Sequence, residues 1–254
     1  MKNIEVKNTN EEYLMDYIKG VYLEDPDSFL LIEIGANDGY CCDRMFPFVK
    51  EYDPNALMVE PLPDYFEQLQ KNYSHLRNIK YENCAISNKE CKKTMTYIPR
   101  EAIINEKVRW RLEHSPHLWK AHWAQGLGSF YKDKNNLGCP ELKEFQEEIV
   151  VSVKTFDYLF EKYDIEKYKN VIVQTDCEGH DLCVLKSFDF NRIKPRAYIT
   201  EIYAYTKYPV SHPKYGKEVG MYSLDDEILA KKIFSQNGYT LYRNNDLIAV
   251  LGGE

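Results

Sequence analysis

The run Phe29–Ile34 (FLLIEI), followed at once by the turn GANDG at 35–39, constrains the fold of this chain more than any other segment. Apolar residues fill almost every position of the run. A strand formed here is therefore buried on both faces, as in a parallel sheet that helices cover on each side. The two glycines predict a tight turn into a following helix. This segment predicts an α/β fold with a ligand site at the end of the strand.

Further elements along the chain extend this prediction. Short apolar runs alternate with stretches of helical spacing, and Asn-Asn-Asp at 244–246 predicts a hairpin near the C-terminus. We predict strands at 29–34, 56–60, 81–86, 149–153, 171–176, 197–202, 239–243 and 247–251, and helices at 40–52 (kinked at Pro47), 63–73, 156–163, 181–188 and 223–237. The order is typical of a doubly wound, mostly parallel seven-stranded sheet with a terminal antiparallel hairpin.

We expect residues 1–254 to form a single domain with two additions. Residues 1–28 are expected to be a helical extension, because Asn10 can cap a helix in which Leu14, Ile18 and Val21 recur at helical spacing. Residues 100–146 interrupt the α/β pattern and are rich in Trp, His and Asn. We interpret them as an insert that forms a lid over the binding site of a second ligand, which we call the acceptor.

Three features near the first strands predict a nucleotide-derived cofactor. The turn has the spacing GxxxG, which lacks the middle glycine of a dinucleotide pyrophosphate site, and Glu33 suits a cationic ligand group instead. Glu60 lies 21 residues after Gly39, at the end of the next strand, where an acid can accept from ribose hydroxyls. The stretch NCAIS at 83–87 closes the third strand, which places its backbone to meet an adenine edge.

Composition excludes several other classes of protein. The net charge is −7 with no long basic run, which argues against binding to a nucleic-acid backbone. The seven cysteines include no CxxC pair, so neither a disulfide framework nor a zinc site is indicated, and free thiols fit a cytoplasmic protein. No run approaches the roughly 18 apolar residues of a membrane span. A homo-oligomer is left open.

The same segments carry a family resemblance. The chain resembles the FkbM family of S-adenosylmethionine (SAM)-dependent methyltransferases from about residue 29 to residue 251. The run DCEGHD at 176–181 is the most specific part, because it is similar to the family signature D-x-E-G-x-D/E after a strand. The resemblance is carried by LIEIGANDG (31–39), VEPLPDYFEQLQKNY (59–73), NCAIS (83–87), GLGSF (126–130), VSVKTFDYLF (151–160), VIVQTDCEGHDLCVLKSFDF (171–190) and AYITEIY (197–203).

The resemblance implies the class I methyltransferase fold and an O-methyltransferase that acts on a hydroxyl of a sugar or glycan. It places Asp176 and Glu178 beside the transferred methyl group, with Asp176 also touching the cofactor. The other implied SAM contacts are Glu33, Gly35, Asn37, Asp38, Gly39, Glu60, Ala85 and Ile86.

Methyl transfer to a hydroxyl benefits from a general base. The candidates are Asp176, Glu178, His180 and Glu201, although Glu178 can instead cap the helix after Gly179 and His180 can bond the backbone there. Asp176 and Glu201 each end a strand, and those strands are expected to be neighbours. Their carboxylates are therefore also candidate ligands for Mg²⁺ or Mn²⁺.

Aromatic segments are expected to shape the acceptor site. Trp faces in the insert offer platforms for sugar rings, or else pack into a local core, and a Tyr-rich loop is a second candidate wall. The side chains concerned are Trp110, His114, His117, Trp119, His122 and Trp123 in the insert, and Tyr203, Tyr205, Tyr208, His212 and Tyr215 in the loop. The alternatives left open are methyl transfer to another small molecule, a lipid or a peptide, and a SAM-binding protein without catalysis. A nicotinamide-dependent oxidoreductase is disfavoured by the missing GxGxxG.

Overall fold

The computed structural model describes residues 4–41, 43–104, 128–132, 134, 140–203 and 220–252. Its main sheet has eight strands in the order β1-β11-β12-β10-β9-β2-β3-β4. Every neighbouring pair is parallel except the two pairs that β12 makes. The strands are β1 (Val6–Asn8), β2 (Phe29–Ile34), β3 (Ala56–Val59), β4 (Ile79–Glu82), β9 (Asn170–Thr175), β10 (Ala197–Thr200), β11 (Tyr239–Arg243) and β12 (Leu247–Leu251).

Helices cover both faces of this sheet, which explains the continuous apolar runs of its central strands. Every residue of β2, β3, β9 and β10 is buried. Along β2, Phe29 and Leu31 join one apolar cluster, while Leu30 and Ile32 join the other. The first cluster includes α1 (Glu11–Glu24), α2 (Phe46–Tyr52) and α3 (Pro63–Asn72), and the second includes α8 (Phe156–Tyr163), α9 (Asp181–Ser187) and α10 (Leu224–Gln236).

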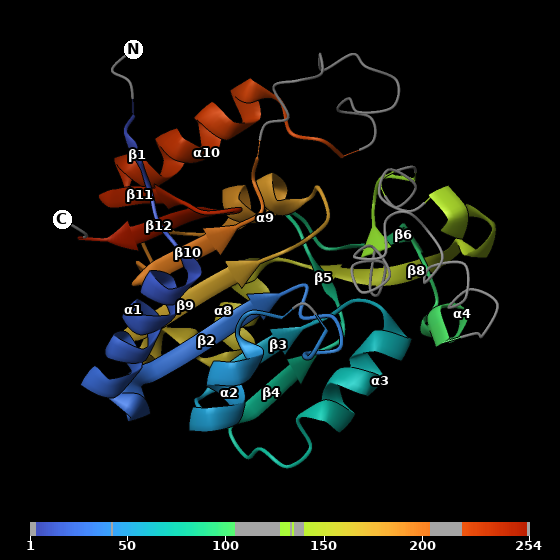
Figure 1. Ribbon diagram of the computed structural model, residues 1–254, viewed down its shortest axis with the longest axis horizontal. Helices are drawn as coiled ribbons and strands as arrows, with labels where there is room; N and C mark the ends of the chain where they lie inside the picture. The colour runs from blue at the N-terminus through green and yellow to red at the C-terminus, as the bar shows by residue number, and fades with distance from the viewer. Residues whose placement is uncertain are drawn as a thin grey trace.

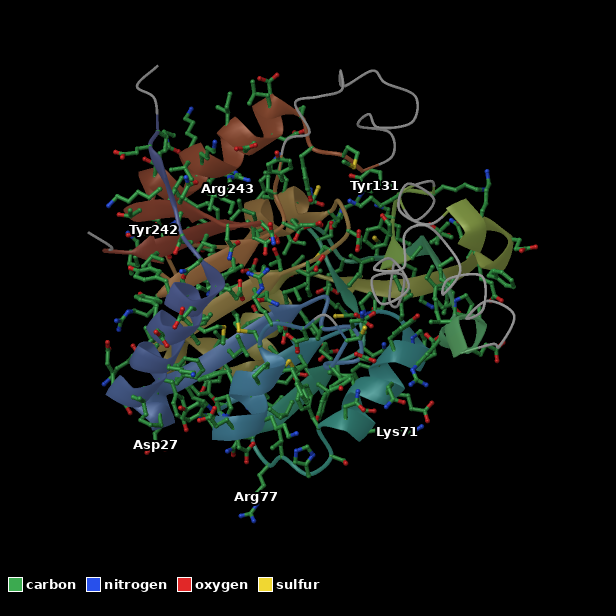
Figure 2. All side chains as sticks on the ribbon, viewed as in Figure 1. Asp27, Lys71, Arg77, Tyr131, Tyr242 and Arg243 are labelled. Carbon is green, nitrogen blue, oxygen red and sulfur yellow. The ribbon has the colours of Figure 1, made fainter. Side chains whose placement is uncertain are left out.

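Figure 1 shows this layering, with α1 and α2 in front of the sheet and α8 behind it. Figure 2 shows Tyr242 and Arg243 on β11 at one end of the sheet and Lys71 on α3 at the other, with side chains packed between them. The hairpin of β11 and β12 is antiparallel as predicted, with Tyr239 opposite Leu251 and Arg243 opposite Leu247.

Local signals in the sequence set several helix starts. Asn10 accepts a hydrogen bond from the Tyr13 amide at the start of α1, and Thr155 caps α8 in the same way. Ser223 and Asp226 form a reciprocal capping box at α10. Pro47 was predicted to kink a helix over 40–52, but α2 begins only at Phe46, so the proline lies in its first turn, where no hydrogen bond is lost.

The N-terminal extension is not only helical, and the predicted count of seven strands is wrong. Residues Val6–Asn8 form β1, which adds an eighth strand to the edge of the sheet, parallel to β11. Val6 pairs with Leu241, far away in the sequence. Three residues, two of them polar, give no periodic pattern, so only the partner strand defines this element.

The predicted strand at 81–86 is in fact two strands in two different sheets. β4 ends at Glu82, and the Asn83 side chain donates to the carbonyl oxygens of Glu60 (2.9 Å) and Pro61 (3.2 Å). The chain then turns, and β5 (Ala85–Ile86) pairs with β8 (Glu147–Lys154). The second sheet has the order β5-β8-β6-β7, with β6 (Cys91–Tyr97) and β7 (Gly128–Ser129).

The predicted insert at 100–146 is described only in part. Its described elements are α4 (Arg100–Ile104), β7 and the 3-10 helix η2 (Pro140–Phe145). Two further 3-10 helices, η1 (Pro26–Ser28) and η3 (Ile165–Lys167), lie outside the insert. The Trp and His side chains proposed as acceptor platforms lie outside the described residues, as do those of the Tyr-rich loop beyond Tyr203. None of the described helices has the length and apolarity needed to span a membrane.

Candidate active site

A cavity opens at the carboxyl ends of β2, β3 and β9 and encloses about 960 Å³ of space, including solvent at its mouth. The second sheet closes one side of it through Met95, Gly128 and Phe130. The predicted site residues that line it are Glu33, Gly35, Asn37, Glu60, Ala85, Ile86, Asp176, Glu178 and His180. Asp38, Gly39 and Glu201 do not line it.

The turn after β2 is shaped mainly by contacts within the protein. Gly35 has a φ of 84°, and a Cβ atom on it would lie 1.9 Å from the carbonyl oxygen of Asp176. Gly39 has a φ of 67° and packs against Leu69 and Tyr73. The Asp38 carboxylate accepts from the amides of Tyr40 (3.0 Å) and Cys41 (2.7 Å). Asp38 and Gly39 therefore hold the turn in place, and the cofactor contacts predicted for them stay predictions.

Glu60 lines the cavity and joins two loops. One carboxylate oxygen accepts from the Leu62 amide (2.8 Å) and the other from the Asn37 amide (2.9 Å). Burial raises the pKa of Glu60 to about 7, against the lowering effect of these two amides. Each carboxylate oxygen has a second lone pair, so the ionised group can still accept from two hydroxyls of a ligand.

The buried carboxyl of Glu33 and the half-buried carboxyl of Asp43 line the same cavity. Glu33 Oε1 accepts from the Gln174 side chain (2.8 Å), whereas Oε2 is buried and accepts from no described donor. Burial and then Asp43 raise the pKa of Glu33 well above its usual value, and burial raises that of Asp43. Two neighbouring carboxyls with an unsatisfied oxygen are suited to a cationic ligand group, such as the ammonium of a methionine moiety.

Asp176 and Glu178 lie at the end of β9 with the ammonium of Lys134. The Asp176 side chain is accessible within the cavity, and Lys134 Nζ lies 3.6 Å from Glu178 Oε2. Loss of solvent within the cavity, followed by the charges of Glu178 and Asp181, raises the pKa of Asp176. Burial also raises that of Glu178, while Lys134 opposes this shift. Glu201 interacts with the same ammonium from β10, and burial followed by Asp176 raises its pKa.

The structure does not favour the predicted metal site at Asp176 and Glu201. Among the described residues, no group of three or more His, Cys, Asp or Glu side chains can hold a metal ion. The charge near these two carboxylates is balanced instead by Lys134, whose pKa they and Glu178 raise against the effect of burial. A lysine ammonium and a divalent cation would repel each other here, so we derive no step through a metal.

His180 is a weaker base than its ordinary pKa suggested. Its Nε2 lies 2.8 Å from the Ser87 hydroxyl, and both side chains are buried. Burial, with a smaller effect from Lys93, lowers the pKa of His180 to about 4. The ring is therefore neutral near pH 7 and has little affinity for a proton, so the carboxylates are the better candidates for the base.

Several residues in the cavity wall or beside it were not predicted from the sequence. Asp43 lies in an irregular stretch before α2, and Lys134 lies within the predicted insert, so neither stands at a strand end that would mark it. Gln174 is the penultimate residue of β9, and its polar side chain within a buried strand is a signal that was overlooked. The apolar wall residues Leu62, Met95 and Phe130 carry no distinguishing pattern.

The structure is that of an α/β protein with a cavity at the carboxyl edge of a mostly parallel sheet, where such folds commonly bind their ligands. The family model for the methyltransferase FkbM domain matches residues 33–241. The chain therefore belongs to the FkbM methyltransferase family, as its resemblance predicted.

Other comparisons add little to this assignment. A similar solved structure is the crystal structure of methyltransferase FkbM from Methylobacillus flagellatus KT, with 13% sequence identity and a TM-score of 0.46. The alignment covers 95% of this chain and 50% of that one, so the chain spans about half the length of this relative. No curated protein matches the sequence significantly.

Proposed function

We propose that this protein is a SAM-dependent O-methyltransferase that methylates a hydroxyl of a sugar or glycan. The observation that supports it best is the order of groups along one cavity. The acid pair Glu33 and Asp43 suits an ammonium, Glu60 suits a ribose diol, and Ala85 and Ile86 provide an apolar wall for adenine. These are the three parts of SAM, and the chain belongs to a methyltransferase family.

The chain also offers the groups that methyl transfer requires. When bound, SAM supplies an electrophilic methyl group on a sulfonium. Asp176 is accessible in the cavity, and its raised pKa makes it a stronger base than an ordinary carboxylate once it is ionised. It is suited to take the proton that the acceptor hydroxyl loses. Lys134 lowers the pKa of Asp176 and of Glu178, which keeps a larger fraction of both groups ionised.

The first test is a calorimetric titration with S-adenosylhomocysteine (SAH), repeated with NAD. Micromolar binding of SAH without binding of NAD is the expected result, whereas folded protein that does not bind SAH would refute the proposal. Acceptors are then screened with labelled SAM, with and without magnesium. We expect turnover without added metal, and we expect Asp176→Asn to lose at least about 100-fold in rate while still binding SAH.

Two outcomes distinguish the alternatives. Tight SAH binding with methyl transfer to a lipid or peptide, and none to sugars, would keep the cofactor and change the acceptor class. SAH binding with no transfer to any acceptor class would favour a SAM-binding protein without catalysis. An Asp176→Asn variant with full activity would remove Asp176 from the role of base.

A further inference from the structure

His180 and Ser87 form a buried polar pair that the proposed methyl transfer does not use. His180 is 6% exposed, Ser87 is 8% exposed, and His180 belongs to the wall of the cavity. Nε2 of the ring lies 2.8 Å from the Ser87 hydroxyl. The other ring nitrogen, Nδ1, is buried and has no hydrogen-bond partner among the described residues. A buried polar atom left unpaired is costly, so His180 Nδ1 requires a partner beyond the described residues.

The Ser87 hydroxyl can donate to Asn88 or to His180, and the first arrangement determines which imidazole nitrogen carries the proton. The Ser87 hydroxyl has a single proton, and Asn88 Oδ1 lies 3.4 Å from its oxygen as an acceptor. If the proton points to Asn88, the Ser87 oxygen accepts from His180, and Nε2 must be the protonated nitrogen. The low pKa of His180 keeps the ring neutral, so Nδ1 then has a free lone pair. The unpaired atom is thus an acceptor that requires a donor.

The surroundings of His180 favour a flat aromatic ligand. Ala85 and Ile86 directly precede Ser87, and both line the cavity. The ring of Phe130 lies edge to face with His180, with 4.9 Å between the ring centroids. Met95 adds a flexible thioether to the same wall. An apolar compartment with one acceptor at its wall matches a heteroaromatic ring that carries one amino group.

We propose that His180 Nδ1 accepts a hydrogen bond from the exocyclic amino group of adenine in the bound cofactor, and that Ser87 holds the imidazole in the required tautomer. This inference rests on the proposed function, because it assigns the adenine end of the SAM site. Hypoxanthine has a carbonyl oxygen where adenine has this amino group, so two acceptors would face each other. His180 therefore selects adenine over hypoxanthine.

The test compares SAH with S-inosylhomocysteine, which carries hypoxanthine, by calorimetric titration of the full chain. We expect the wild-type protein to bind SAH about 10- to 100-fold more tightly than the inosine analogue. The variant His180→Phe keeps an aromatic ring without the acceptor, so its ratio of affinities should fall below about threefold. The matched control is His75→Phe, an identical change at an exposed residue, and it should retain the wild-type ratio.

Ser87→Ala provides a second and milder variant. Without the serine, the ring can place its proton on Nδ1 and donate to the hypoxanthine carbonyl, so the affinity ratio should shrink chiefly through tighter binding of the inosine analogue. Equal wild-type affinity for both ligands would overturn the inference, as would folded variants at both positions that keep the wild-type ratio. Absence of SAH binding would instead refute the proposed function, so the two failures are distinguishable.

Discussion

Replacing Gly35 with alanine tests the contact that brings the carboxyl ends of β2 and β9 together. The added Cβ would lie 1.9 Å from the carbonyl oxygen of Asp176 and 2.9 Å from its carbonyl carbon. Both atoms belong to the backbone, so no side chain can rotate away. The Asp176 amide donates to Ile34 (2.9 Å) and the Gly35 amide to Val59 (2.9 Å), which prevents either segment from retreating.

Two contributions add up to the expected loss of stability. A φ of 84° costs an L-residue about 1–2 kcal/mol, and overpacking of this kind costs about 1–3 kcal/mol more. We therefore expect Gly35→Ala to lower the free energy of unfolding by about 2–5 kcal/mol. Gly238 is a matched control, because its φ is 89° but a Cβ there would meet nothing within 4 Å. Gly238→Ala should lose only the backbone contribution, about 1–2 kcal/mol.

Urea unfolding followed by circular dichroism measures both variants, and thermal unfolding gives a second estimate. The variants differ by the overpacking contribution, so at about 2–4 °C per kcal/mol for a chain of this size Gly35→Ala should melt roughly 2–12 °C below Gly238→Ala. Equal losses in the two variants would refute the argument, because only Gly35 has the close backbone contact.

Two further predictions concern charge. SAH should bind more tightly as the pH rises from 6 to 8, because the pKa of Glu60 is about 7 and its ionised form accepts from hydroxyls. Glu60→Gln should bind SAH about 10-fold more weakly at pH 8 and should not show this rise, whereas the exposed control Glu67→Gln should match wild type. A flat wild-type profile by calorimetry would contradict the assignment of Glu60. Lys134→Met should lower the free energy of unfolding by about 3–5 kcal/mol at pH 8 and by less at pH 6. Loss of the ammonium raises the pKa of Glu178 further, so the folded state then binds protons that the unfolded state releases. Urea unfolding at both pH values measures this difference, and an equal loss at both would show that charge is not the cause.

Strands that show as a continuous run of apolar residues could be predicted from the sequence. The strands at 29–34 and 170–175 and the terminal hairpin have such local patterns, and the structure contains them. β1 could not be predicted, because Val6–Asn8 has no pattern of its own and forms only against β11. The division between β4 and β5 could not be predicted from the sequence either, because the hydrogen bonds of Asn83 to the Glu60 and Pro61 carbonyls depend on the tertiary fold.

The candidate site could be predicted where its residues follow buried strands. Glu33, Glu60 and Asp176 were found in this way, because parallel strands bring their carboxyl ends to one edge of the sheet. Asp43 and Lys134 come from irregular segments whose paths the sequence does not define. The charge of Lys134 also changes the interpretation of Glu201, from a metal ligand to a partner of an ammonium.

The pairing of β1 with β11 has a consequence for how the protein is made. Val6 cannot pair with Leu241 until almost the entire described chain has left the ribosome, so this edge of the sheet is completed late in synthesis. Until then β1 has no partner, and in any fragment that lacks β1 the strand β11 presents unpaired backbone groups to neighbouring chains. Proteolytic fragments that lack the first few residues should therefore be the species most prone to aggregate.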